Sequence, residues 1–227
     1  MSVFKDFINL WRADDLLSQA WKDSYEMMNL SREIFVQALK MLRERSNIAT
    51  LKALKKRDKE INKYQQTVRR KVMTHYAVNR GDTDLESGMV LVNIVVDIER
   101  VGDYTKNILD LALNYPEAII SEELSEDLHL IESEMVSRFD KTLEAIHTQD
   151  AEVAQALISS YREQVNSISD EIVNSILTGE LAFGSESRTA AVALYARYLK
   201  RIGAHLKNIT TTLVNPFDAI GYIRDQD

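Results

Sequence analysis

One ten-residue phrase occurs twice in this chain, and its two copies begin 101 residues apart. The first copy reads Glu-Arg-Val-Gly-Asp-Tyr-Thr-Lys-Asn-Ile over residues 99–108, and the second reads Lys-Arg-Ile-Gly-Ala-His-Leu-Lys-Asn-Ile over residues 200–209. The only two prolines, Pro116 and Pro216, follow the copies at similar distances, where a proline would end a helix that begins upstream. The chain is therefore expected to be a duplicated helical unit.

The composition predicts an all-α fold. Only 7 glycines and 2 prolines occur in 227 residues, which leaves few sites for the tight turns of β-hairpins. Apolar side chains recur at steps of three and four residues, the spacing of a helix with one buried face. The expected helices span about residues 14–45, 48–78, 83–114, 121–147, 150–178 and 186–214, and the fourth of them begins at either Ser121 or Ser125. Thr83 and Glu86 have the spacing of a capping box, so Thr83 is expected to cap the third helix.

Two tandem antiparallel three-helix bundles are the expected architecture, because short turns join the helices in each half. We expect a short amphipathic leader at residues 1–13, a first bundle at 14–116, a second bundle at 117–216 and a tail at 217–227.

The chain contains no cysteine and no long apolar run. The lack of cysteine fits a reducing cytosol and limits any metal site to oxygen or imidazole ligands. No stretch approaches the roughly 20 apolar residues that cross a bilayer. A cytoplasmic protein without a transmembrane segment is therefore expected, while peripheral membrane association and homo-oligomer formation stay open.

Basic and acidic residues are separated along the chain. Residues 40–71 hold 12 of the 28 basic residues and only three acidic ones, whereas residues 107–137 hold eight acidic residues and no lysine or arginine. The basic segment is either a solvated face that meets the acidic helix of the other half, or a docking face for an acidic protein partner. The candidate partner-binding residues are Lys52, Lys55, Lys56 and Arg57. Nucleic acid is disfavoured as the partner, because the segment has one aromatic residue and the pI of the chain is about 5.2.

Two carboxylates of the first copy are candidate metal ligands. Glu99 and Asp103 are four residues apart and so point to one side of their helix, near the apolar stripe that includes Val92 and Val96. Two like charges in such a place need a compensating cation. Asp58 and Asn62 offer a second oxygen pair at the same spacing on the preceding helix.

The nature of the compensating cation is open at this point. A metal ion is one alternative, since carboxylate oxygens bind magnesium, manganese, calcium, iron and zinc. Basic side chains of the chain itself are the other alternative, and these are Arg69, Arg70, Arg100 and Lys106. Gly102, which lies between the two carboxylates, is expected to let another helix approach closely.

No catalytic constellation is found in the sequence. Glu126 with His129, and Glu144 with His147, have the spacing of di-iron carboxylate proteins, which need such motifs on facing helices. Here both motifs lie on one predicted helix, about 27 Å apart at the usual helical rise. There is also no phosphate-cradling glycine loop, so the chain is not expected to be an enzyme.

The first copy, at residues 99–108, closely resembles the helix motif of PhoU-like proteins, which are regulators linked to bacterial phosphate uptake. The duplication, the six-helix layout, and Asn62 and Asn166 in the middle helix of each repeat resemble that family over about residues 14–214. The resemblance implies two three-helix bundles. Because some relatives bind iron or zinc through carboxylate pairs spaced four apart, it also implies a metal at Glu99 and Asp103, with Asp58 and Asn62 a weaker match.

The second repeat departs from this motif. Lys200, Ala204 and Arg162 stand where carboxylates would be expected, so any metal cluster should form on the first bundle. The resemblance implies a cytosolic regulator or accessory protein of phosphate transport or phosphate signalling, with a transporter or sensor component as its protein partner. The alternative is a metal-free helical adaptor unrelated to phosphate.

Overall fold

The structure is a computed structural model that describes residues 15–44, 46–79, 84–115, 119, 125–148 and 150–222. For residue 125 and residues 161–166 it describes the backbone alone. Within these ranges the regular secondary structure is entirely helical, as the composition predicted. The expected leader at residues 1–13 and the side chains of Arg162 and Asn166 lie outside the described part.

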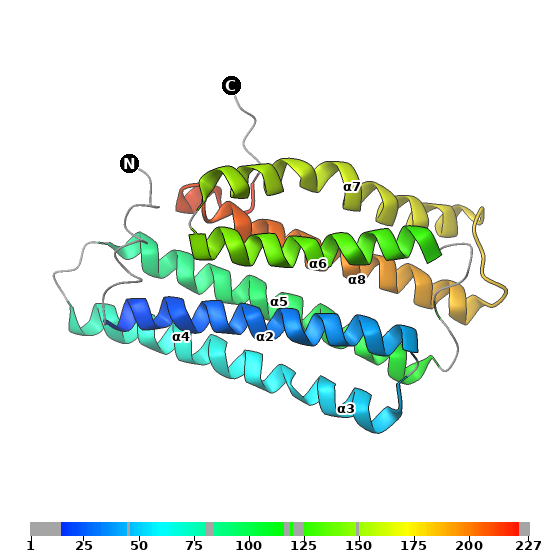
Figure 1. Ribbon diagram of the computed structural model, residues 1–227, viewed down its shortest axis with the longest axis horizontal. Helices are drawn as coiled ribbons and strands as arrows, with labels where there is room; N and C mark the ends of the chain where they lie inside the picture. The colour runs from blue at the N-terminus through cyan, green and yellow to red at the C-terminus, as the bar shows by residue number, and fades with distance from the viewer. Residues whose placement is uncertain are drawn as a thin grey trace.

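Two helical bundles lie side by side along their lengths, as Figure 1 shows. The first bundle contains α2 (Leu16–Glu44), α3 (Ile48–Lys56), α4 (Asp58–Val78) and α5 (Leu85–Asn114). The second contains α6 (Ser125–Thr148), α7 (Ala151–Thr178) and α8 (Glu186–Thr211), and a short 3-10 helix, η2 (Phe217–Ala219), follows. The predicted tandem bundles are therefore confirmed, while the exact domain boundaries stay a prediction.

The second predicted helix is in fact two helices, α3 and α4, which meet at Arg57. The Arg57 N–H donates to the Leu54 carbonyl at 3.0 Å, and the Glu60 N–H donates to the Arg57 carbonyl at 2.8 Å, so the chain tightens to 3-10 bonding here. The Arg57 guanidinium binds Glu33 of α2 at 2.7 Å. This break makes Asp58 the first residue of α4.

Short polar residues cap several helices, and two predicted ends were wrong. Asp84, not Thr83, accepts the first-turn N–H of Ser87 at 3.2 Å and caps α5, while Thr83 itself lies outside the described residues. The last long helix ends at Thr211 instead of residue 214. The hydroxyls of Thr211 and Thr212 donate to carbonyls three residues back, which competes with regular helical bonding.

Apolar side chains form one core that runs through both bundles. Helix α5 is the central element, because it packs against α2, α4 and α8. Between the bundles, Phe35 of α2 lies 5.5 Å from Phe139 of α6, measured between ring centroids. Both rings are almost completely buried. Burial of this kind stabilises the joined bundles, by about 1.5–3 kcal/mol for each large apolar side chain.

The described helices include none with a stretch long and apolar enough to cross a bilayer.

Candidate functional site

The four candidate metal ligands gather where the beginning of α4 meets the middle of α5. Asn62 donates its amide to Asp58 Oδ2 at 3.2 Å. The Lys106 ammonium lies 3.3 Å from the same Asp58 oxygen and 3.2 Å from Asp103 Oδ1, so it joins the two helices. The two oxygen pairs thus lie close together, with a lysine between them.

Gly102 allows this close meeting of helices. A Cβ at this position would lie 3.0 Å from Cδ1 of Ile61 and 3.7 Å from Oδ1 of Asp58. A side chain at this position would therefore crowd the buried Ile61 side chain, which would have to shift to make room. The close approach agrees with the prediction made for this glycine.

Side chains of the chain itself provide the positive charge at the site. Besides Lys106, the Arg100 guanidinium lies 3.0 Å from Asp103 Oδ2 and 3.7 Å from Glu99 Oε2. The other two basic candidates, Arg69 and Arg70, are exposed on α4. Of the two alternatives left open by the sequence, the described contacts support the internal cations.

The ionisation of the site follows from this arrangement. Partial burial, together with the nearby charge of Asp103, raises the pKa of Glu99 above its ordinary value. For Lys106 partial burial acts against the charged form, but the hydrogen bond to Asp103 and the charge of Asp58 outweigh it and raise its pKa. The ammonium is therefore held in its charged form.

The residues as placed do not form a ready metal site. Among the described residues, no group of three or more His, Asp or Glu side chains is arranged to hold a metal ion. Asp58 Oδ1 is buried without a hydrogen-bond partner, as a ligand oxygen could be, but Lys106 occupies the space between Asp58 and Asp103. A metal bridging these two carboxylates would have to displace the ammonium, and the metal site stays a prediction.

The second bundle carries a different arrangement at the equivalent position. Lys200, which replaces Glu99 in the second copy, lies 2.6 Å from both carboxylate oxygens of Asp170 on α7. Ala204 has no charge to offer. The described part of this bundle thus has an ordinary ion pair where the first has a carboxylate cluster.

The two copies of the phrase meet in the molecule, which sequence reasoning missed. Tyr104 and His205 hold the same position in the two copies, and their rings stack with centroids 5.8 Å apart. His205 Nδ1 also lies 2.7 Å from Asp97 Oδ1. Helices α5 and α8 run in opposite directions in Figure 1, so equivalent positions of the two copies can face each other. The duplication itself was the signal that could have predicted this contact.

The candidate partner-binding residues divide into two pairs. Lys55 forms an ion pair with Asp110 of α5, and Arg57 binds Glu33, whose pKa it lowers through their hydrogen bond. Lys52 and Lys56 are exposed on the outside of α3. Of these four residues, only Lys52 and Lys56 form no ion pair with another described residue.

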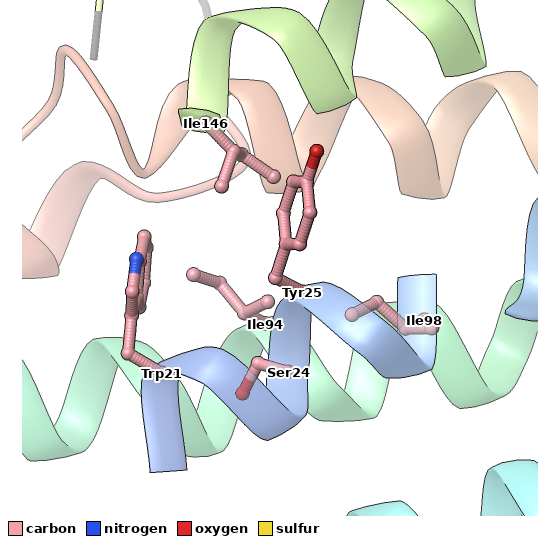
Figure 2. A pocket seen from close by; sticks show the side chains of 6 residues that line it. All are labelled: Trp21, Ser24, Tyr25, Ile94, Ile98 and Ile146. Atoms are coloured by element: carbon pink, nitrogen blue, oxygen red, sulfur yellow. The ribbon is translucent and has the colours of Figure 1, made fainter. Parts of the chain in front are cut away.

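A small pocket, with room for about one water molecule, lies between the bundles. Figure 2 shows its lining, and the residues are Trp21, Ser24, Tyr25, Ile94, Ile98 and Ile146. The Ser24 hydroxyl donates to the Ala20 carbonyl of its own helix at 2.8 Å. The lining is therefore mainly apolar, and it lacks the convergent polar groups of a typical ligand site.

Both Glu-x-x-His motifs lie on α6, as the sequence predicted. His129 is 3.4 Å from Arg43 of α2, and the His147 ring lies 5.8 Å from the ring of Tyr25. Each histidine thus contacts α2 at a different level, and the two motifs cannot share a pair of metal ions.

Comparison with known proteins supports the fold and the duplication. The PhoU phosphate transport system regulatory protein of Streptococcus pneumoniae is 20% identical, with a TM-score of 0.74 over 87% of this chain and 93% of that chain. PhoU from Pseudomonas aeruginosa is 18% identical, with a TM-score of 0.73 over 88% of this chain and 95% of that chain. No curated protein matches the chain. The model of the PhoU domain matches twice, at residues 25–112 and 131–213. Because these two matches cover most of both bundles, the chain belongs to the PhoU domain family.

Proposed function

We propose that this protein is a cytosolic regulator of phosphate transport or phosphate signalling that acts by binding a protein component of that system. The observation that carries the proposal is the match of the PhoU domain to both repeats. The Streptococcus pneumoniae protein of the same fold is a phosphate transport system regulatory protein, which supports the same process here. A binding role also suits a chain whose charged clusters pair with one another instead of surrounding a reactive group.

The exposed face of α3 and α4 is the proposed contact surface for an acidic partner. Its basic residues recur at steps of three, four and seven, which places them along one side of the helices, and they are Lys52, Lys56, Lys59, Lys63 and Arg70. None of the five has an ion-pair partner in the described part of the chain. Lys55 and Arg57 stabilise the first bundle and lie at the edge of this face.

A complementation experiment tests both parts of the proposal. Deleting the gene should change the rate of phosphate uptake or phosphate-dependent gene expression, and the wild-type chain should restore it. The double variant Lys52→Glu with Lys56→Glu should fail to restore it, whereas Lys141→Glu should succeed, because Lys141 is an equally exposed lysine on α6. A deletion without any effect on phosphate would contradict the phosphate assignment. If the double variant restored phosphate regulation fully, this would contradict the basic contact surface but not the phosphate assignment.

The proposed binding role does not require a resident metal, and the metal site at Glu99 and Asp103 stays a separate prediction. The ion pairs of Lys106 and Arg100 already compensate the carboxylates of the first bundle, and this observation favours the metal-free form of the adaptor. If the protein is instead an adaptor unrelated to phosphate, deleting its gene should change neither phosphate uptake nor phosphate-dependent gene expression.

A further inference from the structure

Four large apolar side chains are exposed where α4 ends and α5 begins. The exposed fractions are 70% for Met73, 70% for Val78, 59% for Leu85 and 49% for Met89. Such side chains are individually common on protein surfaces, but a group of them in one place indicates a contact surface. Figure 1 shows that this end of the α4–α5 pair lies at one end of the elongated molecule.

The antiparallel pairing of α4 and α5 places the four residues at the same end of the helix pair. The Tyr76 hydroxyl accepts the Gly88 N–H at 3.1 Å and donates to the Asp84 carbonyl. This register sets Met73 beside Met89 along the pair, and Val78 beside Leu85.

The same outer face holds the carboxylate cluster further along. Met89, Val96 and Asp103 are seven residues apart on α5, and residues at this spacing share one side of a helix. Asp103 forms an ion pair with Lys106, which in turn forms an ion pair with Asp58 of α4. The outer side of α5 thus runs along α4 from the carboxylates to the apolar end.

Exposed positive charge lies on the α4 side of the apolar group. The stretch of α4 from residue 61 to residue 78 contains no acidic residue. Lys63, Arg69 and Arg70 in this stretch are exposed, and none of them has an ion-pair partner among the described residues. On the α5 side, Asp84 and Glu86 flank Leu85, and they accept the backbone N–H groups of Ser87 and Phe217. A contact surface with this composition favours an occupant that is apolar where it meets the four side chains and negatively charged where it meets α4.

We propose that this end of the α4–α5 pair, with Met73, Val78, Leu85 and Met89, docks on the surface of an anionic lipid bilayer. The bilayer offers acyl chains to the four apolar side chains and phosphate headgroups to Arg69 and Arg70, which lie about one turn before Met73 on α4. Side chains as exposed as these project from the surface, as insertion into lipid requires, whereas side chains that line a groove for a partner helix are shielded by its walls. Docking of this kind does not depend on the phosphate assignment.

Vesicle flotation of the full chain tests the proposal. At low ionic strength the protein should float with vesicles of phosphatidylcholine and phosphatidylglycerol in equal parts, and much less with vesicles of phosphatidylcholine alone. Met73→Gln with Leu85→Gln should lower the partition coefficient about tenfold or more, through lost apolar burial. Arg69→Gln with Arg70→Gln should lower it on the anionic vesicles and weaken its dependence on salt.

Leu177→Gln is the matched control, since Leu177 is 78% exposed at the end of α7, at the opposite end of the molecule. It should leave flotation unchanged. Absence of wild-type binding to the anionic vesicles, or an equal loss with Leu177→Gln, would overturn the proposal. It would also be overturned if the Met73 and Leu85 variant floated normally but changed the protein from dimer to monomer in light scattering, because the occupant would then be a second copy. Far-UV circular dichroism should show an unchanged fold in every variant.

Discussion

Lys106 holds together two carboxylates that come from different helices. Its ammonium lies within 3.3 Å of both Asp58 and Asp103, while the Arg100 guanidinium forms ion pairs with Asp103 and Glu99. Of the three carboxylates, Glu99 has its negative charge least well compensated. Partial burial and the charge of Asp103 raise its pKa. At the scale of single residues, an internal lysine does the electrostatic work that a metal ion could do.

Replacing Lys106 should convert this ion pair into a better metal site. Wild-type protein incubated with Fe²⁺ or Zn²⁺ and then desalted should retain well under one equivalent of metal. Lys106→Met should retain more, because Asp58, Glu99 and Asp103 are then left without the ammonium. Without metal, the variant should lose about 1 kcal/mol of unfolding free energy, the upper range for a partly exposed pair. Elemental analysis and urea denaturation measure the two effects.

Lys200→Met provides the control for this experiment. It removes the ammonium that binds Asp170 in the second bundle, where the phrase lacks the carboxylate pair. Its metal content should equal that of the wild type. If the wild-type protein kept a full equivalent that Glu99→Gln abolished, the sequence-based metal site would be correct, and Lys106 would not be the cation that compensates these carboxylates.

The sequence predicted which residues would gather at this site but not which cation would join them. Spacing alone places Glu99 with Asp103, and Asp58 with Asn62, each on one side of a helix. The meeting of Asp58 with Lys106 depends on the relative positions of α4 and α5 along their axes, and no local pattern encodes that register. From the sequence alone, the side chain of Lys106 could equally have pointed to solvent.

At the scale of elements, helix existence and most ends could be predicted, because periodicity and capping residues are local signals. Asn47 and Asp150 cap α3 and α7, which begin within one residue of the predicted starts at residues 48 and 150. The break at Arg57 could not be predicted, since no glycine or proline marks it. At the break, Arg57 forms ion pairs with Glu33 of α2 and with Glu60, and the first of these forms only in the folded bundle.

Gly88 determines how closely the start of α5 lies against the end of α4. A Cβ there would lie only 2.7 Å from the Tyr76 hydroxyl, which accepts the Gly88 N–H. Gly88→Ala should therefore destabilise the protein by about 1–3 kcal/mol through overpacking, although alanine favours a helix by about 1 kcal/mol. Urea denaturation measures the change.

A double-mutant cycle with Tyr76→Leu separates the two contributions. If the Tyr76 ring causes the strain, Gly88→Ala should cost much less in the Tyr76→Leu background, where helix propensity dominates. A stabilising effect of Gly88→Ala in the wild-type background would show that Tyr76 moves aside freely and that the glycine is not required.

At the scale of the whole molecule, the bundles are joined by polar as well as apolar contacts. Asp97 of α5 contacts His205 and Asn208 of α8, at 2.7 and 3.2 Å. Arg43 of α2 reaches Glu132 of α6 at 2.6 Å. The sequence predicted two bundles but not this interface, because contacts between distant segments leave no periodic signal. The continuous core indicates that the bundles should unfold together.

Glu132 is the residue whose loss should test that coupling most directly. Its buried carboxylate accepts a hydrogen bond from the hydroxyl of Tyr195 on α8 and forms an ion pair with Arg43 across the bundles. Tyr195 is fully buried, and burial together with the charge of Glu132 raises its pKa. Glu132→Ala leaves a buried hydroxyl and a half-buried guanidinium without these contacts, so the unfolding free energy should fall by about 3 kcal/mol. Asp140→Ala, which breaks the exposed pair with Arg32 between the same two helices, should cost less than about 1 kcal/mol.

Fluorescence, chiefly of the buried Trp21, and far-UV circular dichroism should report one shared urea transition in both variants, since the core remains continuous. Equal losses in the two variants would show that the buried network contributes no more than a surface ion pair, and separate transitions would show that the bundles are independent domains.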